Sequence, residues 1–234
     1  MVRRLRRLAR RREPGLALLE GPRVVAEAAA AGVELELIAV REGDECGVDA
    51  SRRITLSRAV FRSISQTVTP QGVVAIAKVH ESPVSDAIAA ARAKQWPLVV
   101  LDRVQDPGNV GAICRTAAAA GAPALAVLEG CADPLGAKSV RASAGNVFRL
   151  TIARAAWDDL AGLSGYGAAA AGGAPLANSP IENAGMIVLG SEAHGLSHSN
   201  LELVTIPLDE GVDSLNVAAA AALLLFEVRR RRAS

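Results

Sequence analysis

The second half of the chain alternates short apolar segments with segments that suit helices, and this pattern constrains the fold more than any other feature. Apolar strands that alternate with helices indicate a mostly parallel sheet with helices on both faces. The expected strands span residues 98–102, 124–128, 150–153, 167–171, 186–189 and 204–207. The expected helices span residues 110–121, 137–146, 157–163 and 217–232. We therefore predict an α/β domain built on a sheet of about six strands.

The first part of the chain predicts a smaller α/β unit. Strands are expected at residues 16–19, 35–40 and 73–77, helices at 1–12, 21–31 and 57–63, and a polar loop at 41–53. A unit of under about 80 residues is small for a separate enzyme. Pro83 and Pro97 bracket a further helix, and prolines of this kind mark boundaries. We place the junction near Gln95, which gives domains at 1–95 and 96–234.

The composition excludes several classes of protein. Half of the residues are hydrophobic and 21% are charged, which indicates a globular rather than a disordered chain. No uncharged apolar run reaches about 18 residues, so no membrane span is expected. The basic N-terminus is not followed by the apolar stretch and cleavage site of a secretory signal. Cys46, Cys114 and Cys131 are too far apart for a disulfide framework or a zinc site, so we expect a reduced, cytoplasmic protein.

The arginines are concentrated at the two ends of the chain. Seven lie within residues 3–12 and four within 229–232, although the formal net charge is only +2. Because a guanidinium group pairs with phosphate in a bidentate manner, such clusters indicate a nucleic-acid surface. The alternative interpretation is that a GC-rich genome favours arginine codons, and that the clustered side chains are exposed to solvent without binding nucleic acid. Aromatic residues make up 3% of the chain, which argues against a base-stacking platform. The candidate RNA-binding residues of the first segment are Arg3, Arg4, Arg7, Arg10 and Arg11.

Common nucleotide-binding and hydrolase motifs are missing from the sequence. It contains no G-x-G-x-x-G after a strand, no P-loop and no G-x-S-x-G elbow. His194 and His198 are four residues apart, but Gly195 lies between them and no third ligand stands out. We therefore expect no metal site.

The first strand of the large domain runs into a polar turn and then a helix that carries two candidate residues. Asn109 stands near the helix start, where it could serve as the N-cap. Arg115 lies between apolar neighbours and a run of alanines, where a charge is costly without an anionic or polar partner. That partner is either a bound ligand or an acidic residue of the chain itself.

Two later strands also end in polar loops. Gly190 permits close approach of a ligand to the backbone, and Glu192 could bond backbone amides or hold an arginine. Ser214 and Asn216 precede the long C-terminal helix, which either of them could cap. In the alternative interpretation, both point into a site at the carboxyl ends of the strands, where α/β proteins bind ligands.

Taken together, these three segments resemble the SpoU (TrmH) family of RNA 2′-O-ribose methyltransferases, within the SPOUT superfamily. The family pattern N-x-G-x-x-x-R-x-A is matched from Asn109 to Ala117, and G-S/A-E-x-x-G-L from Gly190 to Leu196. The third pattern, I-P followed by S-L-N-V, is matched at 206–207 and 214–217. Over two shorter stretches, 18–21 and 69–73, the front part resembles the L30e-like substrate-binding domain of ribosomal-RNA members.

The resemblance implies a knotted sheet and a site shared between subunits. The C-terminal segment would thread through a loop as a trefoil knot, and the protein would form a homodimer with its active sites at the interface. The cofactor S-adenosylmethionine would bind in the knot, held largely by backbone groups. The residues implied in cofactor binding are Leu189, Gly190, Ser191, Ile206, Leu208 and Leu215, with Leu189 and Leu208 walling the adenine.

The implied reaction is methylation of a ribose 2′-hydroxyl, with 23S ribosomal RNA as the expected substrate because of the extra front domain. A tRNA ribose methyltransferase and a non-catalytic RNA-binding protein stay open as alternatives. The implied catalytic residues are Arg115, Asn109, Glu192, Ser214 and Asn216. A guanidinium with a pKa above about 12 is a poor base. We therefore expect Arg115 to grip the adjacent phosphate and polarise the hydroxyl, while Glu192 braces the site.

Overall fold

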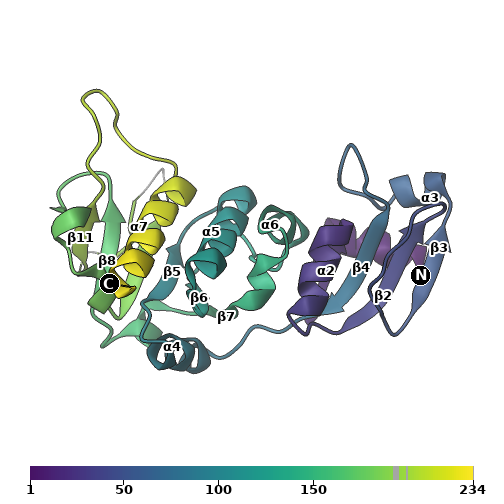
Figure 1. The fold of residues 1–234 in the computed structure, drawn as a ribbon, viewed down its shortest axis with the longest axis horizontal. Helices are drawn as coiled ribbons and strands as arrows, with labels where there is room; N and C mark the ends of the chain where they lie inside the picture. The colour runs from purple at the N-terminus through teal and green to yellow at the C-terminus, as the bar shows by residue number, and fades with distance from the viewer. Residues whose placement is uncertain (192–194, 199, 234) are drawn as a thin grey trace.

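Two β-sheets, one small and one large, follow each other along the chain (Figure 1). The computed structural model describes residues 1–191, 195–198 and 200–233. The first sheet has four strands in the order β1-β4-β2-β3, and the second has seven in the order β7-β6-β5-β10-β8-β11-β9. In Figure 1 the small sheet lies at the right with the N-terminus, and the large sheet lies at the left with the C-terminus.

The small sheet belongs to the front part of the chain and is mostly antiparallel. Its strands are β1 (Leu16–Glu20), β2 (Leu35–Arg41), β3 (Arg53–Leu56) and β4 (Val73–Lys78). Its helices are α1 (Val2–Arg10), α2 (Pro22–Ala30) and α3 (Arg58–Arg62). Strand β4 pairs antiparallel with both β1 and β2, and β3 pairs parallel with β2 at the edge. Successive strand residues point to opposite faces, so Leu18 and Ile76 face a core that includes Leu5 of α1, whereas Leu19 faces another core that includes Val25 of α2.

The large sheet is parallel at every pair of neighbouring strands. Its strands are β5 (Leu98–Asp102), β6 (Ala124–Val127), β7 (Thr151–Arg154), β8 (Gly165–Ala169), β9 (Ala174–Pro175), β10 (Met186–Gly190) and β11 (Glu202–Thr205). The helices are α4 (Val84–Ala93), α5 (Pro107–Ala120), α6 (Ala137–Ala142) and α7 (Val217–Arg232). Short 3₁₀ turns lie at Asn146–Arg149, Trp157–Leu160, Leu176–Asn178 and Ile181–Asn183. Helices α5 and α7 pack on one face and α4 on the other, as expected for a buried parallel sheet.

The path of the chain through this sheet places late strands at its centre. β5, β6 and β7 run outward in sequence order, and β10 then inserts between β5 and β8. The carboxyl ends of β8, β10 and β11 therefore meet at one edge, where ligands of open α/β sheets bind. The trefoil knot stays a prediction of the family resemblance.

One local expectation was wrong, and two short strands were not expected. The loop expected at residues 41–53 is present, and it is followed by β3, a four-residue edge strand that was not expected although its residues alternate polar and apolar. The helix expected at 157–163 is a single 3₁₀ turn. The large sheet has a seventh strand, β9, which is only two residues long and lies at the sheet edge. Pieces of two to four residues are too short for a pattern to identify them.

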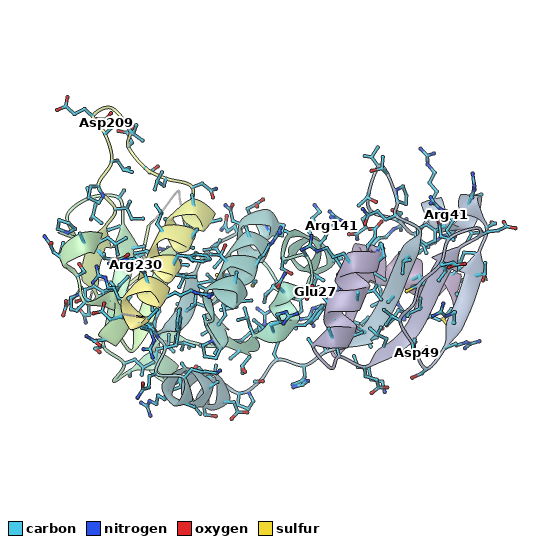
Figure 2. All side chains as sticks on the ribbon, viewed as in Figure 1. Glu27, Arg41, Asp49, Arg141, Asp209 and Arg230 are labelled. Carbon is cyan, nitrogen blue, oxygen red and sulfur yellow. The ribbon has the colours of Figure 1, made fainter. Side chains whose placement is uncertain are left out.

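The two sheets share one hydrophobic core. The cluster that contains Leu19 and Val25 of the front part also contains Val99 of β5 and Ile113 of α5. At the same junction, Arg149 Nη2 lies 2.8 Å from Glu27 Oε2, and Figure 2 labels Glu27 and Arg141 in this region. The front part is therefore packed against the large sheet rather than tethered beside it.

Candidate active site

A pocket of about 460 Å³ lies at the carboxyl ends of β8, β10 and β11. Its walls come from the end of β8, from the loop after β10, and from the loop that joins β11 to α7. Most of its lining is apolar, with Leu203, Val204 and Leu224 among the contributors. The volume lies within the range of about 300–1,000 Å³ typical of small-molecule sites.

Gly190 allows the backbone to fold tightly against itself at the mouth of this pocket. Ser191 and Gly195 form an isolated bridge, in which the Gly195 amide donates to the Ser191 carbonyl at 2.8 Å. A Cβ on Gly190 would stand 2.7 Å from the carbonyl carbon and oxygen of Gly195. Any side chain there would push this loop away, so the residue at 190 must be glycine for the pocket to keep its shape.

The loop after β10 is fastened to the sheet through a buried carboxylate. Asp102, at the end of β5, is 1% exposed. It accepts hydrogen bonds from the Ser197 amide and from the Ser197 hydroxyl, the latter at 2.9 Å. Trp157 Nε1 donates to the same hydroxyl oxygen at 2.9 Å, and its ring stacks on His198 at 4.6 Å between centroids. Since His198 lines the pocket, these contacts position one of its walls.

The residues expected to bind the cofactor are mostly in the pocket lining. Those that line it are Gly190, Ser191, Ile206, Leu208 and Leu215, together with the catalytic candidate Ser214. Leu189 is fully buried in the core shared by the two sheets and is not among the lining residues. Glu192 lies outside the described residues.

The first and third motifs meet through a pair of asparagines. Asn216 Nδ2 donates to Asn109 Oδ1 at 3.1 Å, which ties the start of α7 to the start of α5. Asn216 also caps α7 by accepting from the Ala218 amide at 3.0 Å. Asn109 is not the cap of α5, because Asp106 holds that position and accepts from the Asn109 amide at 2.9 Å. Because Asp106 provides the cap, the side chain of Asn109 contacts Asn216 instead of capping α5.

Arg115 is exposed on α5, which corrects the expectation of an enclosed charge. The buried face of α5 carries Ile113, Cys114 and Ala117, and helical periodicity turns position 115 away from it. The alanines that follow Arg115 in sequence do not surround it in space. Its guanidinium is therefore available to a molecule that docks on this face.

The five candidate arginines of the first segment divide into two groups. Arg4 forms an ion pair with Glu36, and Arg7 Nε pairs with Glu13. Arg3, Arg10 and Arg11 are exposed, and no ion pair involving them is found within the described part of the chain. The segment is also structural, because Leu5 and Leu8 of α1 are buried in the core.

Sequence reasoning missed the contacts of Asp102, Trp157, Ser197 and His198. The signal for Asp102 was present, since a carboxylate directly after four apolar strand residues must find hydrogen-bond donors. Its hydrogen-bond partner Ser197 is 95 residues away, and no local pattern identifies such a partner. Among the described residues, no group of three or more His, Cys, Asp or Glu side chains could hold a metal ion.

Residues 97–226, more than half of the chain, match the sequence profile of the SpoU rRNA Methylase family. The chain belongs to this family. Residues 1–75 of this SpoU family member match the MRM3-like substrate binding domain, which agrees with the front domain expected from the resemblance. No described helix is long and apolar enough to cross a membrane.

Relatives of this SpoU family member act on ribosomal RNA. It is 32% identical over 225 residues to the 23S rRNA (guanosine(2553)-2′-O)-methyltransferase RlmP of Bacillus subtilis, covering 91% of this chain and 88% of that protein. It is 28% identical to the mitochondrial rRNA methyltransferase 3A of Danio rerio, covering 94% of this chain and 65% of that protein.

Two similar structures contain the cofactor. The AdoMet-bound rRNA methyltransferase from Sinorhizobium meliloti is 29% identical, with a TM-score of 0.81 over 98% of this chain and 94% of that one. The SpoU methyltransferase AviRb from Streptomyces viridochromogenes, also with AdoMet, is 25% identical, with a TM-score of 0.82 over 100% and 98%. This SpoU family member is accordingly an S-adenosylmethionine-dependent RNA methyltransferase. Its largely apolar pocket with a glycine-bracketed backbone edge fits that cofactor.

Proposed function

We propose that this protein methylates a ribose 2′-hydroxyl in 23S ribosomal RNA. The observation that carries the proposal is the contact between Asn109 and Asn216, which brings two of the three motifs together beside the pocket. The Bacillus subtilis relative, which aligns along 91% of the chain, carries out this reaction on a 23S guanosine. Because ribosomal RNA is the substrate, we place the activity in the cytoplasm.

The protein side of the reaction is positioning and exclusion of water. S-adenosylmethionine supplies an electrophilic methyl group on a sulfonium. Leu208 and Leu215 line the pocket and shield it from water, and backbone groups at Gly190 and Ile206 are placed to hold the cofactor. Asn109 and Asn216 fix the rim on which the ribose is oriented. Glu192 is proposed to brace this rim.

Arg115 is proposed to bind the phosphate next to the target ribose and to polarise its hydroxyl. The guanidinium is permanently charged and presents a fork of donors that matches phosphate geometry. Its exposure on α5 leaves it open to RNA. A group that cannot be deprotonated at neutral pH does not take the hydroxyl proton itself.

We further propose that the active unit is a homodimer. Leu223 and Phe226 on α7 are 48% and 46% exposed, and large apolar side chains grouped on one helix favour a protein partner. α7 packs against α5, the helix that carries Arg115. A second copy on this face would cover the apolar residues and bring each Arg115 toward the pocket of the other subunit.

The test is methyl transfer from radiolabelled S-adenosylmethionine to ribosomal RNA isolated from a strain that lacks the gene. We expect incorporation into 23S RNA at one ribose, mapped by resistance of the adjacent bond to alkaline cleavage. Transfer RNA from the same strain serves as the comparison. Incorporation into tRNA alone would favour the tRNA alternative, and binding of RNA without any incorporation would favour a non-catalytic protein.

A further inference from the structure

A second depression, of about 280 Å³, lies where the front domain meets the catalytic domain. Its walls come from the end of α1 with the residues after it, and from the segment that begins α6. Pro107, the first residue of α5, also lines it. We call this depression the junction groove. It is separate from the cofactor pocket, and the lining residues of the two do not overlap.

The charge of the junction groove is positive and largely uncompensated. Arg12 is bound on both sides, by Glu81 at 2.9 Å and by Asp133. Arg10, Arg11 and Lys138 also line the groove, and all three are exposed. Within the described residues, none of these three forms an ion pair. Arg12 already neutralises Asp133, so three cationic side chains face the groove without a counter-charge.

A buried hydroxyl in the same groove lacks a hydrogen-bond partner. Ser139 is 1% exposed and lines the groove, and its Oγ makes no hydrogen bond to any described atom. Buried polar groups are almost always paired in folded proteins. A hydroxyl can donate to an anionic oxygen, and the cations on the opposite wall would attract the same anion.

The position of the groove connects it with the catalytic residues. Pro107 lies two residues before Asn109, which pairs with Asn216 at the rim of the active site. The other wall comes from α1, within the segment that matches a substrate-binding domain. A polymer that crosses the domain junction toward the active site would pass through this groove.

We propose that the junction groove binds a backbone phosphate of the RNA substrate, held by Arg10, Arg11 and Lys138 and by a hydrogen bond from Ser139. The inference rests on the proposed function to the extent that RNA is the substrate. It adds a specific anchoring point, between the two domains and away from the reacting ribose. A phosphodiester fits better than a protein carboxylate, because RNA presents such groups along its whole length.

The first test removes the groove charges by the double substitution Arg11→Ala with Lys138→Ala. Binding of a 23S RNA transcript is measured by filter retention at several KCl concentrations. We expect about tenfold weaker binding, and a salt slope reduced by roughly 0.7–0.9 if one phosphate contact is lost. The matched control is Arg92→Ala with Lys94→Ala, which removes the same two residue types from exposed positions at the end of α4. Equal slopes in the two double variants would overturn the proposal.

The second test removes the hydroxyl by Ser139→Ala. Loss of an unpaired buried hydroxyl should leave the melting temperature equal or higher, whereas RNA binding should weaken by roughly two- to tenfold. A lower melting temperature with unchanged RNA binding would show a structural role and refute the assignment.

Inorganic phosphate alone distinguishes a free-anion site from an RNA site. We expect it to raise the melting temperature of the parent more than that of Ser139→Ala, because the proposed site includes this hydroxyl. A phosphate shift that requires Ser139, with unchanged RNA binding, would overturn the proposal. Binding of S-adenosylmethionine, measured calorimetrically, should stay unchanged in all of these variants. RNA retention does not depend on which atom is methylated. The RNA-binding results could therefore still be interpreted if the ribose assignment failed.

Discussion

The carboxylate of Asp102 and the hydroxyl of Ser197 form a 2.9 Å hydrogen bond that joins the end of β5 to the loop after β10. The carboxylate is buried and the hydroxyl belongs to a loop next to the pocket that we propose holds the cofactor. Charge-assisted hydrogen bonds of this kind are stronger than neutral ones. This hydrogen bond therefore fixes the loop that forms one wall of the pocket to the end of strand β5.

We expect Ser197→Ala to weaken S-adenosylmethionine binding about fivefold. The substitution removes the hydroxyl shared by Asp102 and Trp157 but keeps the amide bond to the carboxylate, and one hydrogen bond contributes about 1 kcal/mol. Calorimetric titration with the cofactor measures the change. Ser85→Ala, an exposed serine on α4, is the control. Equal affinity in the two variants would contradict this positioning role.

Arg115→Ala should abolish methyl transfer while cofactor affinity stays within about twofold of the parent. The residue is exposed on α5 and does not line the cofactor pocket of its own chain. Loss of an interaction made in the transition state lowers kcat rather than cofactor binding. Steady-state methyl transfer and cofactor titration give the two values, with Arg92→Ala as the control. Near-normal turnover would refute the catalytic assignment.

Acid should destabilise the protein in part through Glu227. Hydrogen bonds from Arg230 and Arg231 lower the pKa of this carboxyl from its usual 4.5 to about 2. Because the pKa of Glu227 is lower in the folded state than in the unfolded chain, its ionised carboxylate stabilises the folded state above about pH 4.5. This contribution is lost as the pH falls from about 4.5 toward 2. Urea unfolding at several pH values should show a shallower acid dependence for Glu227→Gln. An unchanged pH profile would show that these hydrogen bonds do not contribute.

Cys114 should resist alkylation until the protein unfolds. Burial raises the pKa of its thiol to about 12, and the reactive species is the thiolate. At pH 8 we expect iodoacetamide to modify the partly exposed Cys46 first and Cys114 only in denaturant. Peptide mass spectrometry identifies the modified site. Rapid native labelling of Cys114 would show that the packing of α5 opens readily.

The sequence predicted the regular parts of the fold well, because periodicity reflects burial. Strand β5 and helix α7 occur at the expected residues, since each presents an uninterrupted apolar face to the core. The seven-stranded sheet confirms the mostly parallel architecture. Edge strand β3 escaped prediction because it is only four residues long.

The site was predicted less completely, because its contacts join distant parts of the chain. The motif residues around Gly190 and Leu215 do line one pocket. The environment of Arg115 was inferred from its neighbours in sequence, whereas the helix turns it outward. The Asp102–Ser197 contact spans 95 residues, and the partner-free hydroxyl of Ser139 is visible only in three dimensions.

Because the two sheets share one apolar core, the front domain is held at a fixed position relative to the large sheet. Leu19 and Val25 pack in the same cluster as Val99 and Ile113, so the spacing between the two surfaces that we propose to face the RNA is set by side-chain packing. A flexible tether would let the enzyme sample many nucleotides around its docking point. A rigid offset should instead select the one ribose that stands at the matching distance along the folded RNA.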